Sequence, residues 1–235
     1  MREIYKSCEL ALFSCEPQDF EEASRNEDWI NAMNEEMATI VKNKTWEMVN
    51  LPNGKETNGL KWIFKIKYNE DGSIKKYKVR LVAKEYSQLP EVDFTETFAP
   101  VARMETIWIV LALAAQMELN VFQLDVKLTF LNGEIVEEVY VEQPKGYEVK
   151  GEENKVYRLW KAFYGLKQAP RSWNSKIDRY LVKNGFHRSS SEPSFYVKKE
   201  GTDFFIVYLY VDDIIYCGTN LKMVEEFKKS MLDEF

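Results

Sequence analysis

The sequence predicts an α+β fold in which helices back one face of an antiparallel sheet. Three observations carry this prediction: the order of segments after residue 120, a hairpin pattern over residues 61–84, and a second hairpin pattern over residues 204–218. After residue 120 the order is strand, strand, strand, helix, strand hairpin, helix. Such an order favours an antiparallel sheet over alternating parallel units. With 235 residues, 45% of them hydrophobic, the chain can bury a core as one domain or two packed subdomains.

The first regular element is expected to be a helix that starts at Asp28. Its apolar residues recur with the spacing of one helical face, and Asp28 can cap its N-terminus. The acidic, weakly patterned residues 1–27 are expected to be a loosely ordered lead-in. Residues 43–59 hold one proline and two glycines, so we expect them to be irregular.

Residues 61–84 alternate lysine and apolar side chains on both sides of a turn at residues 69–72. This alternation has the period of a half-exposed strand, and the glycine at position 72 suits a turn that needs a positive φ. One face of the hairpin is therefore expected to be cationic and the other buried. A cationic face of this kind suits contact with a triphosphate or a template better than a purely structural role.

The remaining elements follow from the same signals of periodicity, proline and glycine. Pro100 and Pro170 are placed to open helices, and Gly185 to end the second of them. We expect a loop at 89–100, helices at 101–119, 170–184 and 222–235, and strands at 121–127, 139–142, 156–160 and on both sides of residues 212–213.

An adjacent acidic pair, Asp212 and Asp213, interrupts the apolar run 204–218 and is expected to form its turn. Two carboxylates about 5 Å apart repel by roughly 3 kcal/mol at an effective dielectric of about 20, so a divalent cation is a suitable neighbour. Aspartates also occur in ordinary turns for their backbone geometry alone. The strand 121–127 delivers a further acid, Asp125. One carboxylate on a strand and two on a turn can together hold the ions of a two-metal phosphoryl-transfer site.

The net charge of −6 does not favour a nucleic-acid partner, but the distribution of charge does. Residues 61–88 and 155–188 carry net charges of +5 and +8, interleaved with aromatic residues, in an otherwise acidic chain. Such blocks suit a phosphate backbone, although solvated faces would look the same. No apolar run is long enough for a membrane span, the N-terminus lacks a signal-peptide pattern, and the three cysteines form no framework. We expect a cytoplasmic or nuclear protein that is not secreted and has no membrane contact; the oligomeric state is left open.

Seven ordered blocks together resemble the reverse transcriptase domain of copia-type LTR retrotransposons. The resemblance covers nearly everything from about residue 16 to the end, and so many blocks in order are far more specific than one short motif. The blocks are NKTWEMVNLP (43–52), KWIFKIKYNEDGSIKKYKVRLVAK (61–84), DFTETFAPVARMETI (93–107), QLDV (123–126), FLNGEIVEEVYVEQPKGY (130–147), YGLKQAPRSW (164–173) and YVDD (210–213).

The resemblance implies a right-hand polymerase palm, whose antiparallel sheet is backed by helices, and a fingers subdomain with a basic β-hairpin. On this basis residues 28–120 are expected to be fingers-like and 121–235 palm-like, with the thumb and ribonuclease H regions absent. It implies RNA-directed DNA polymerase activity, in which a primer 3′-hydroxyl attacks a dNTP on an RNA or DNA template-primer. Two Mg²⁺ or Mn²⁺ ions are the implied cofactors.

Site residues are implied by position within the matching blocks. The catalytic and metal-binding set is Asp125, the Val126 carbonyl, Asp212 and Asp213, with Asp213 shaping the site more than holding both ions. The implied nucleotide contacts are Phe130, as a gate against the ribose 2′-hydroxyl, Gln168, and the hairpin cations Lys65, Lys67, Arg80 and Lys84. The implied template and primer contacts are Pro170, Arg171, Tyr210, Lys176 and Arg179. Phe130 and Tyr210 are also compatible with roles as ordinary core aromatics.

The sequence departs from the family pattern at a few positions. Glu85 and Glu91 stand where glycine is common, and Leu128 and Thr129 replace a pair of small residues beside the expected metal site. Replacing glycine costs most where φ is positive. A truncated, catalytically inactive retrotransposon remnant that only binds nucleic acid is therefore a second hypothesis. A phosphohydrolase or nuclease using the same carboxylates is less favoured, because no histidine or lysine general base is linked to them.

Overall fold

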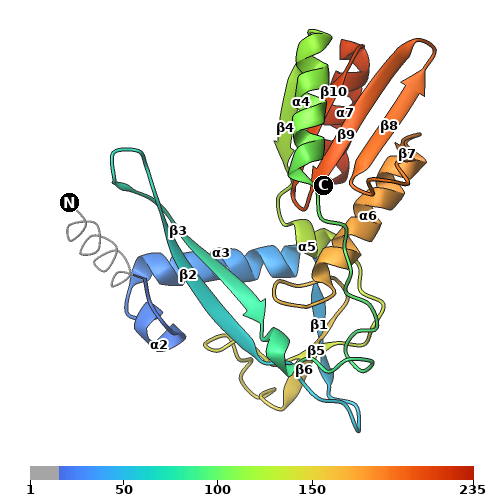
Figure 1. Ribbon diagram of the computed structural model, residues 1–235. Helices are drawn as coiled ribbons and strands as arrows, with labels where there is room; N and C mark the ends of the chain where they lie inside the picture. Colours follow the sequence, from blue (N-terminus) through green and yellow to red (C-terminus); the bar gives the residue numbers. More distant parts are fainter. Residues whose placement is uncertain (1–15) are drawn as a thin grey trace. The chain divides into compact units, whose positions relative to one another are not determined.

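The structure, a computed structural model, describes residues 16–235 (Figure 1). The chain folds into two compact units, each made from two stretches. One unit contains the described residues up to Thr95 together with Ile135–Lys167, and the other contains Glu96–Glu134 together with Gln168–Phe235. The division therefore does not fall at residue 120. Most of the expected lead-in, with Cys8 and Cys15, lies outside the described residues.

The first unit contains a three-stranded antiparallel sheet in the order β1-β6-β5 and a separate two-stranded hairpin of β2 and β3. A mixed α/β architecture with antiparallel sheets is thus present. Its elements are α2 (Phe20–Ala23), α3 (Glu27–Lys42), β1 (Trp46–Asn50), β2 (Leu60–Tyr68), β3 (Ile74–Ala83), the 3₁₀ turn η1 (Glu85–Ser87), β5 (Tyr140–Val141) and β6 (Lys155–Leu159).

Two sequence-based expectations for this unit were wrong. The segment expected to be irregular contains β1, which pairs with β6, and Trp46 stacks on Tyr157 with ring centroids 4.3 Å apart. Helix α2 lies within the expected loose lead-in, where the Asp19 side chain accepts a hydrogen bond from the Glu22 N–H. Both elements are too short to show a clear periodicity in the sequence, and elements of this length depend on contacts with the rest of the protein for their stability.

Helix α3 is confirmed, although its N-cap is Asn26 rather than Asp28. The Asn26 side chain accepts a 2.8 Å hydrogen bond from the Asp28 backbone N–H. An asparagine in extended backbone conformation caps a helix as well as an aspartate does. Asp28 instead adds negative charge to the first turn, where the helix dipole favours it.

The basic hairpin is confirmed, and its two faces differ as expected. Trp62, Phe64 and Ile66 of β2 are buried, whereas the three lysines that alternate with them are exposed. Gly72 has a φ of +83° in the turn. The buried face packs on α3, where the Trp29 ring meets Phe64 edge-on at 5.4 Å. The cationic face therefore follows from the alternation of the strands around one apolar contact surface.

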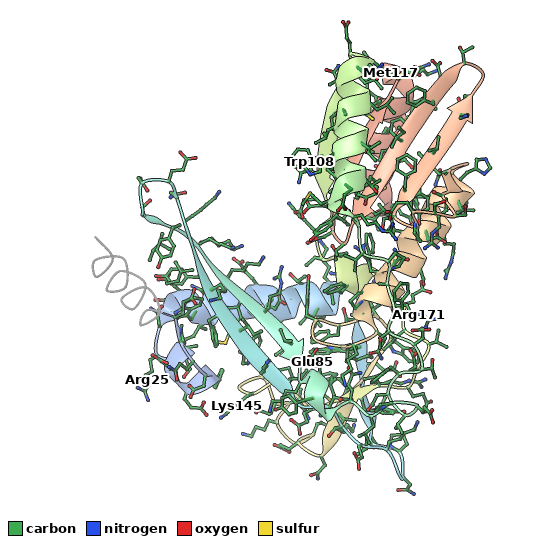
Figure 2. All side chains as sticks on the ribbon, viewed as in Figure 1. Arg25, Glu85, Trp108, Met117, Lys145 and Arg171 are labelled. Atoms are coloured by element: carbon green, nitrogen blue, oxygen red, sulfur yellow. The ribbon has the colours of Figure 1, made fainter. Side chains whose placement is uncertain are left out.

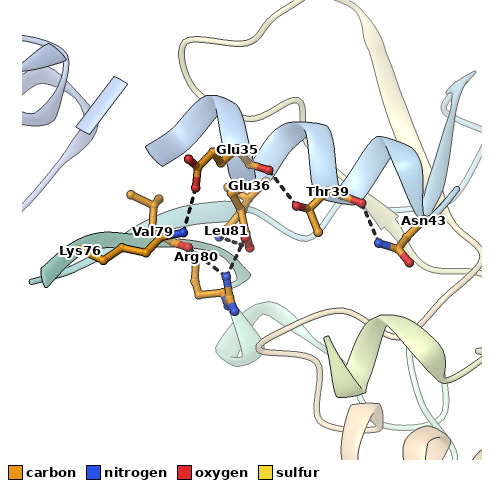
Figure 3. Close-up of polar contacts among 8 residues, drawn as sticks. All are labelled: Glu35, Glu36, Thr39, Asn43, Lys76, Val79, Arg80 and Leu81. Atoms are coloured by element: carbon orange, nitrogen blue, oxygen red, sulfur yellow. Dashed lines mark hydrogen bonds and ion pairs between the residues drawn. The ribbon is translucent and has the colours of Figure 1, made fainter. Parts of the chain in front are cut away.

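A buried ion pair joins α3 to β3 (Figure 3). The Glu36 carboxylate accepts a 2.8 Å hydrogen bond from Arg80 Nη1 and a 3.4 Å hydrogen bond from the Leu81 N–H. Burial raises the pKa of Glu36, and the nearby Arg80 charge only partly offsets that rise. Glu35, one residue earlier, pairs with Lys76 at 3.0 Å in an exposed position. Glu35 and Glu36 thus each form an ion pair with the hairpin, the first exposed to solvent and the second buried.

The second unit contains a five-stranded antiparallel sheet in the order β4-β10-β9-β8-β7. Strands β7 and β8 were not expected: β7 is only two residues long, and β8 is defined by its pairing with β9. Its elements are α4 (Met104–Gln116), β4 (Val121–Asp125), α5 (Thr129–Asn132), α6 (Ala169–Lys183), β7 (His187–Arg188), β8 (Phe195–Glu200), β9 (Asp203–Tyr210), β10 (Asp213–Gly218) and α7 (Leu221–Glu234).

Helices cover both faces of this sheet, so the expectation of helices on one face was wrong. Helices α6 and α7 pack on one face, in a core that includes Trp173, Val207 and Phe227. Helix α4 packs on the opposite face through Val110 and Ala114, against Ile206 and Cys217 (Figure 1). Successive strand residues point to opposite faces, and β9 and β10 are apolar at successive positions. A strand that is apolar on both faces needs cover on both.

Helix α4 begins at Met104, three residues later than expected, because Arg103 is extended. The Tyr208 hydroxyl fixes this start: it accepts a 2.6 Å hydrogen bond from the Arg103 N–H and donates one of 3.0 Å to the Arg103 carbonyl. Burial raises the pKa of Tyr208, which keeps the hydroxyl proton available to donate. The outer side of α4 carries Trp108, which is 64% exposed (Figure 2). No helix in residues 16–235 is long and apolar enough to span a bilayer.

Glu85 and Glu91, which stand where the resemblance implies glycine, occupy different backbone conformations, which predicts opposite effects of substituting glycine. Glu91 has a φ of +64°, whereas Glu85 opens η1 and is not in the left-handed region. We expect Glu91→Gly to raise the free energy of unfolding by about 0.5–1 kcal/mol, because the left-handed strain is removed. Glu85→Gly should lower it by a similar amount, about 0.5–1 kcal/mol, because only chain entropy changes. Urea denaturation of both variants measures this, and a shift of the same sign in both would contradict the explanation.

Candidate active site

Antiparallel pairing of β4 with β10 brings the backbone positions of the three aspartates to one end of the sheet. Asp125 is the direct partner of Asp213 in the register, and directly opposed residues in such a pair lie about 4.5–5.5 Å apart at Cα. Asp212 precedes Asp213, and its carbonyl accepts a 2.9 Å hydrogen bond from the Val126 N–H. Two carboxylates from distant parts of the sequence thus face each other at one end of the sheet, with the third beside them.

The turn between β9 and β10 is centred on Val211 and Asp212, one residue earlier than the expected Asp-Asp turn. Tyr210 and Asp213 close it as a register pair, and Val211 has a φ of +56°. A β-branched residue with positive φ is strained and persists only where its surroundings enforce it. The Trp173 indole N–H supplies part of that enforcement through a 2.7 Å hydrogen bond to the Val211 carbonyl. Asp213 is therefore the first residue of β10 and not part of the turn.

The register also puts Gln123, Asp125, Asp213 and Tyr210 on one face of the sheet, the face on which α4 packs. The Gln123 side-chain amide donates a 2.8 Å hydrogen bond to one oxygen of Asp213. Sequence reasoning assigned no role to Gln123. Its position two residues before Asp125 was the available signal, because residues i and i+2 of a strand share a face. Gln123 orients Asp213 and leaves Asp125 and Asp212 exposed to solvent.

The chain turns sharply after Asp125 and enters the short helix α5. Leu128 has φ +57° and ψ +30°, a left-handed conformation that glycine adopts more easily. The Thr129 hydroxyl donates a 2.5 Å hydrogen bond to the Val126 carbonyl. A carbonyl oxygen has two lone pairs, so this bond leaves one acceptor position on Val126. A side chain on Gly133 would come within 2.8 Å of the Trp173 backbone nitrogen, so α5 and α6 approach as closely as a glycine permits.

The donor set fits a hard divalent cation. Asp125, Asp212 and Asp213 contribute carboxylate oxygens and Val126 a carbonyl, which are the ligands Mg²⁺ and Mn²⁺ prefer. The exposed positions of Asp125 and Asp212 leave room for water ligands. Within residues 16–235, no three acidic, cysteine or histidine side chains are already gathered closely enough to hold an ion. The carboxylates would therefore have to rotate toward an ion as it binds. Solvent-exposed acidic side chains can do this by changing rotamer.

Five other predicted site residues lie in the same unit as the carboxylates, in different settings. Tyr210 is 46% exposed on the face of Asp213, and Arg171 is exposed near the start of α6 (Figure 2). Pro170 lies in the first turn of α6, and with Trp173 and Val211 it lines a small depression. Phe130 is half-buried against the sheet core, and Gln168 is 1% exposed. Contact of the Gln168 side chain with a nucleotide would thus require its neighbours to move.

The four hairpin cations belong to the other unit and differ in their partners. Arg80 bonds to Glu36 and lies 5.1 Å from the centre of the Tyr164 ring. Lys65 pairs with Glu16 at 2.8 Å. Lys67 is exposed and forms no ion pair with any residue in 16–235, and Lys84 is half-buried. Lys67 is therefore the cation of this set that is most available to a ligand.

Lys176 and Arg179 of α6 are not gathered with the carboxylates. Both line a groove between α6 and α7, the helices on the sheet face opposite to that of Asp125 and Asp213. Lys176 also pairs with Glu234 at 3.7 Å. The spacing of these cations correctly predicted a basic helix face, but periodicity does not show which side of a sheet the helix will cover.

Comparison with known proteins identifies the family. The family model described as reverse transcriptase (RNA-dependent DNA polymerase) matches residues 43–235. The Pol polyprotein of transposon TNT 1-94 from Nicotiana tabacum is 40% identical over 237 residues, which cover 98% of this chain and 18% of the relative. That of transposon RE1 from Arabidopsis thaliana is 40% identical over 221 residues, covering 94% of this chain and 15% of the relative.

A more distant relative is the Gag-Pol polyprotein of transposon Ty1-BL from Saccharomyces cerevisiae, which is 28% identical over 199 residues and covers 83% of this chain. The chain spans less than a fifth of the length of these relatives. The resemblance inferred from the sequence blocks is confirmed. This chain belongs to the reverse transcriptase (RNA-dependent DNA polymerase) family, with relatives in the Pol polyproteins of copia-type retrotransposons.

Proposed function

We propose that this chain is the catalytic part of an RNA-directed DNA polymerase that transfers a nucleotide from a dNTP to a primer 3′-hydroxyl on an RNA or DNA template. One observation carries the proposal: the β4–β10 register that opposes Asp125 and Asp213, with Asp212 held beside them by Val126. Carboxylates with these positions suit two divalent ions roughly 3.5–4 Å apart. Family membership supports the same reaction.

In this proposal the residues of the chain bind and orient the reactants and act neither as nucleophile nor as covalent carrier. Asp125 and Asp212 present carboxylates to Mg²⁺ or Mn²⁺, and Gln123 holds Asp213 so that it shapes the site. When bound, the ions supply electrostatic stabilisation of the charge that develops on the phosphoryl oxygens. The strained turn at Val211 presents Tyr210 on the same face, a position that suits contact with a template-primer. The reaction is an in-line displacement that depends on positioning.

We further propose that the second unit, Glu96–Glu134 with Gln168–Phe235, is the polymerase palm and that the first unit contributes the fingers. The palm assignment rests on the antiparallel sheet that carries all three aspartates. The fingers assignment rests on the exposed lysine face of the β2–β3 hairpin, which suits a triphosphate. Among its cations we assign that contact to Lys67, because Arg80 is already bound to Glu36.

A second function is supported by a specific observation beside the site. Leu128 is held in a left-handed conformation where the family commonly has a small residue, which strains the turn that follows Asp125. A chain that had lost selection for polymerisation would tolerate such a change. The alternative proposal is a nucleic-acid-binding remnant that does not polymerise.

Primer extension on an RNA template tests the proposal. With poly-A, oligo-dT, dTTP and Mg²⁺ or Mn²⁺, we expect weak extension by the wild-type chain, and a loss of at least about 100-fold in Asp125→Asn and in Asp212→Asn. Asp233→Asn, an exposed change in α7, is the matched control and should leave extension unchanged. Extension that survives in Asp125→Asn and Asp212→Asn would contradict the assignment of the site.

A second measurement distinguishes a chain that lacks the metal site from one that binds the metal but extends the primer slowly. Added Mg²⁺ should raise the melting temperature of the wild-type chain and of Asp233→Asn, because a ligand that binds only the folded state stabilises it. The shift should disappear in Asp125→Asn. Binding of a template-primer duplex without extension, and without any Mg²⁺-dependent shift, would favour the non-polymerising alternative.

A further inference from the structure

A groove runs between α6 and α7 on the sheet face opposite to the carboxylates. It consists of two adjoining cavities, of about 160 Å³ and about 300 Å³. Tyr180, Asn184 and Ser230 line both of them, so the two form one continuous site. None of the three aspartates lines it, and the proposed polymerase reaction assigns it no role.

Three phenylalanines form the floor of the smaller cavity, and Lys198 and Glu226 also line it. Phe186, Phe205 and Phe227 line it, with ring centroids 5.2–5.7 Å from one another, and Met223 closes one side. A volume of about 160 Å³ is large enough for a single six-membered ring. The phenylalanine floor also gives a planar ring the edge-to-face contacts that aromatic pairs prefer. The shape and chemistry of this part thus fit one aromatic ring.

The larger cavity is cationic. Lys176, Arg179 and Lys183 recur at positions i, i+3 and i+7 of α6 and face Glu234 of α7. Glu234 pairs with Lys176 at 3.7 Å. Within residues 16–235, neither Arg179 nor Lys183 has an ion-pair partner, so this part of the groove keeps an excess of positive charge. A phosphate or similar anion is the complementary ligand, because guanidinium and ammonium groups form their strongest hydrogen bonds with charged oxygens.

Hydroxyl groups connect the two parts. The Tyr180 and Ser230 hydroxyls lie 2.6 Å apart at the junction of the cavities. Burial raises the pKa of Tyr180, so the phenol stays protonated and adds no negative charge. The junction is therefore polar but neutral, and it suits the ester oxygen that joins a ring to an anionic group.

We propose that the α6–α7 groove binds a small anion that carries a single aromatic ring, the chemical class of the aryl phosphates. The ring occupies the cavity walled by Phe186, Phe205 and Phe227, and the phosphate lies against Arg179 and Lys183. Neither half alone explains the groove: a purely apolar ligand leaves the cations unpaired, and a bare phosphate leaves the aromatic cavity empty. The site does not depend on the carboxylates, and it is separate from the proposed polymerase reaction.

Titration of the whole chain with phenyl phosphate tests the proposal, by calorimetry and by amide chemical shifts. We expect saturable binding, with the largest shifts at Asn184, Phe186 and Ser230. Lys183→Gln and Arg179→Gln should each weaken it about tenfold, the effect of losing one charge-assisted hydrogen bond of roughly 1.4 kcal/mol. Lys228→Gln removes an exposed cation of α7 that does not line the groove, so its affinity should equal that of the wild type.

Two further experiments test the contributions of the ring and of the phosphate separately. Phenol and inorganic phosphate should each bind at least tenfold more weakly than phenyl phosphate, and Met223→Trp should weaken phenyl phosphate by filling the ring cavity. Equal binding of inorganic phosphate and phenyl phosphate would overturn the proposal. An affinity for phenyl phosphate that is unchanged in Lys183→Gln would also overturn it. If phenyl phosphate does not bind and Lys183→Gln weakens the binding of a template-primer duplex, the groove is a nucleic-acid binding surface and the proposal is again overturned.

Discussion

Replacing Trp173 by alanine is expected to lower the free energy of unfolding of the second unit by about 4 kcal/mol, the usual cost of removing a buried tryptophan. Trp173 is 2% exposed in the core under the sheet, and its ring packs edge-on against Phe235 at 5.2 Å. Its indole N–H also bonds to the carbonyl of the strained Val211. The alanine variant thus loses both the core contact and the anchor of the turn that carries Asp212. Urea denaturation followed by circular dichroism measures the change.

Two variants separate these contributions. Trp173→Phe keeps an aromatic ring in the core but removes the N–H and part of the indole, so it should cost about 1–2 kcal/mol, less than the alanine change. Trp108→Ala removes a tryptophan that is 64% exposed on α4 and should change stability by less than about 0.5 kcal/mol. A cost of Trp108→Ala as large as that of Trp173→Ala would show that the core of this unit is not where the structure places it.

Replacing Glu36 by alanine is expected to lower the free energy of unfolding by about 3 kcal/mol, because one partner of a buried ion pair is removed. The Glu36 side chain is 5% exposed, and its loss leaves Arg80 and the Leu81 N–H without their acceptor (Figure 3). Glu35→Ala is the matched control, since the Glu35–Lys76 pair is more than half exposed on both sides. Exposed pairs contribute little, so the control should change stability by less than about 0.5 kcal/mol. Equal costs in the two variants would contradict this account.

Neutral glutamine at position 36 should behave differently from alanine, and its effect should depend on pH. Burial raises the pKa of Glu36 above its ordinary 4.5, so the folded chain holds this proton more tightly than the unfolded chain does. The resulting stabilisation is complete below pH 4.5 and is lost as the pH rises through the raised pKa. Glutamine keeps an acceptor for Arg80 without that loss. The stability of Glu36→Gln relative to wild type should therefore rise between about pH 4.5 and pH 7, and a fall over that range would contradict the direction of the pKa shift.

The sequence by itself predicted the elements whose patterns are long and strongly periodic. Residues 61–84 alternate lysine and apolar residues over two strands, and the structure has that hairpin with that cationic face. Proline and glycine correctly marked the limits of α6, where Pro170 lies in the first turn and Gly185 has a φ of +84° after the last. The order of short motifs was also enough to identify the family. These features depend on local residue order, which a sequence displays directly.

Elements held by distant partners could not be predicted in this way. Strand β1 exists because β6, more than a hundred residues later, pairs with it, and α2 is a single capped turn. Both faces of β9 and β10 are apolar, but only the packing of α4 showed that the second face is also covered. Neither pairing partners nor the side on which a helix packs is encoded in periodicity.

For the site, the sequence by itself determined that Asp125 lies at the end of one apolar run and that an adjacent pair of aspartates interrupts another. Only the tertiary structure decided that Asp125 faces Asp213, that the turn is centred on Val211 and Asp212, and that Gln123 and Trp173 hold the hydrogen bonds around it. The reason is that strand register is set by pairing across the sheet, and a shift of one residue would have turned each of these side chains to the other face.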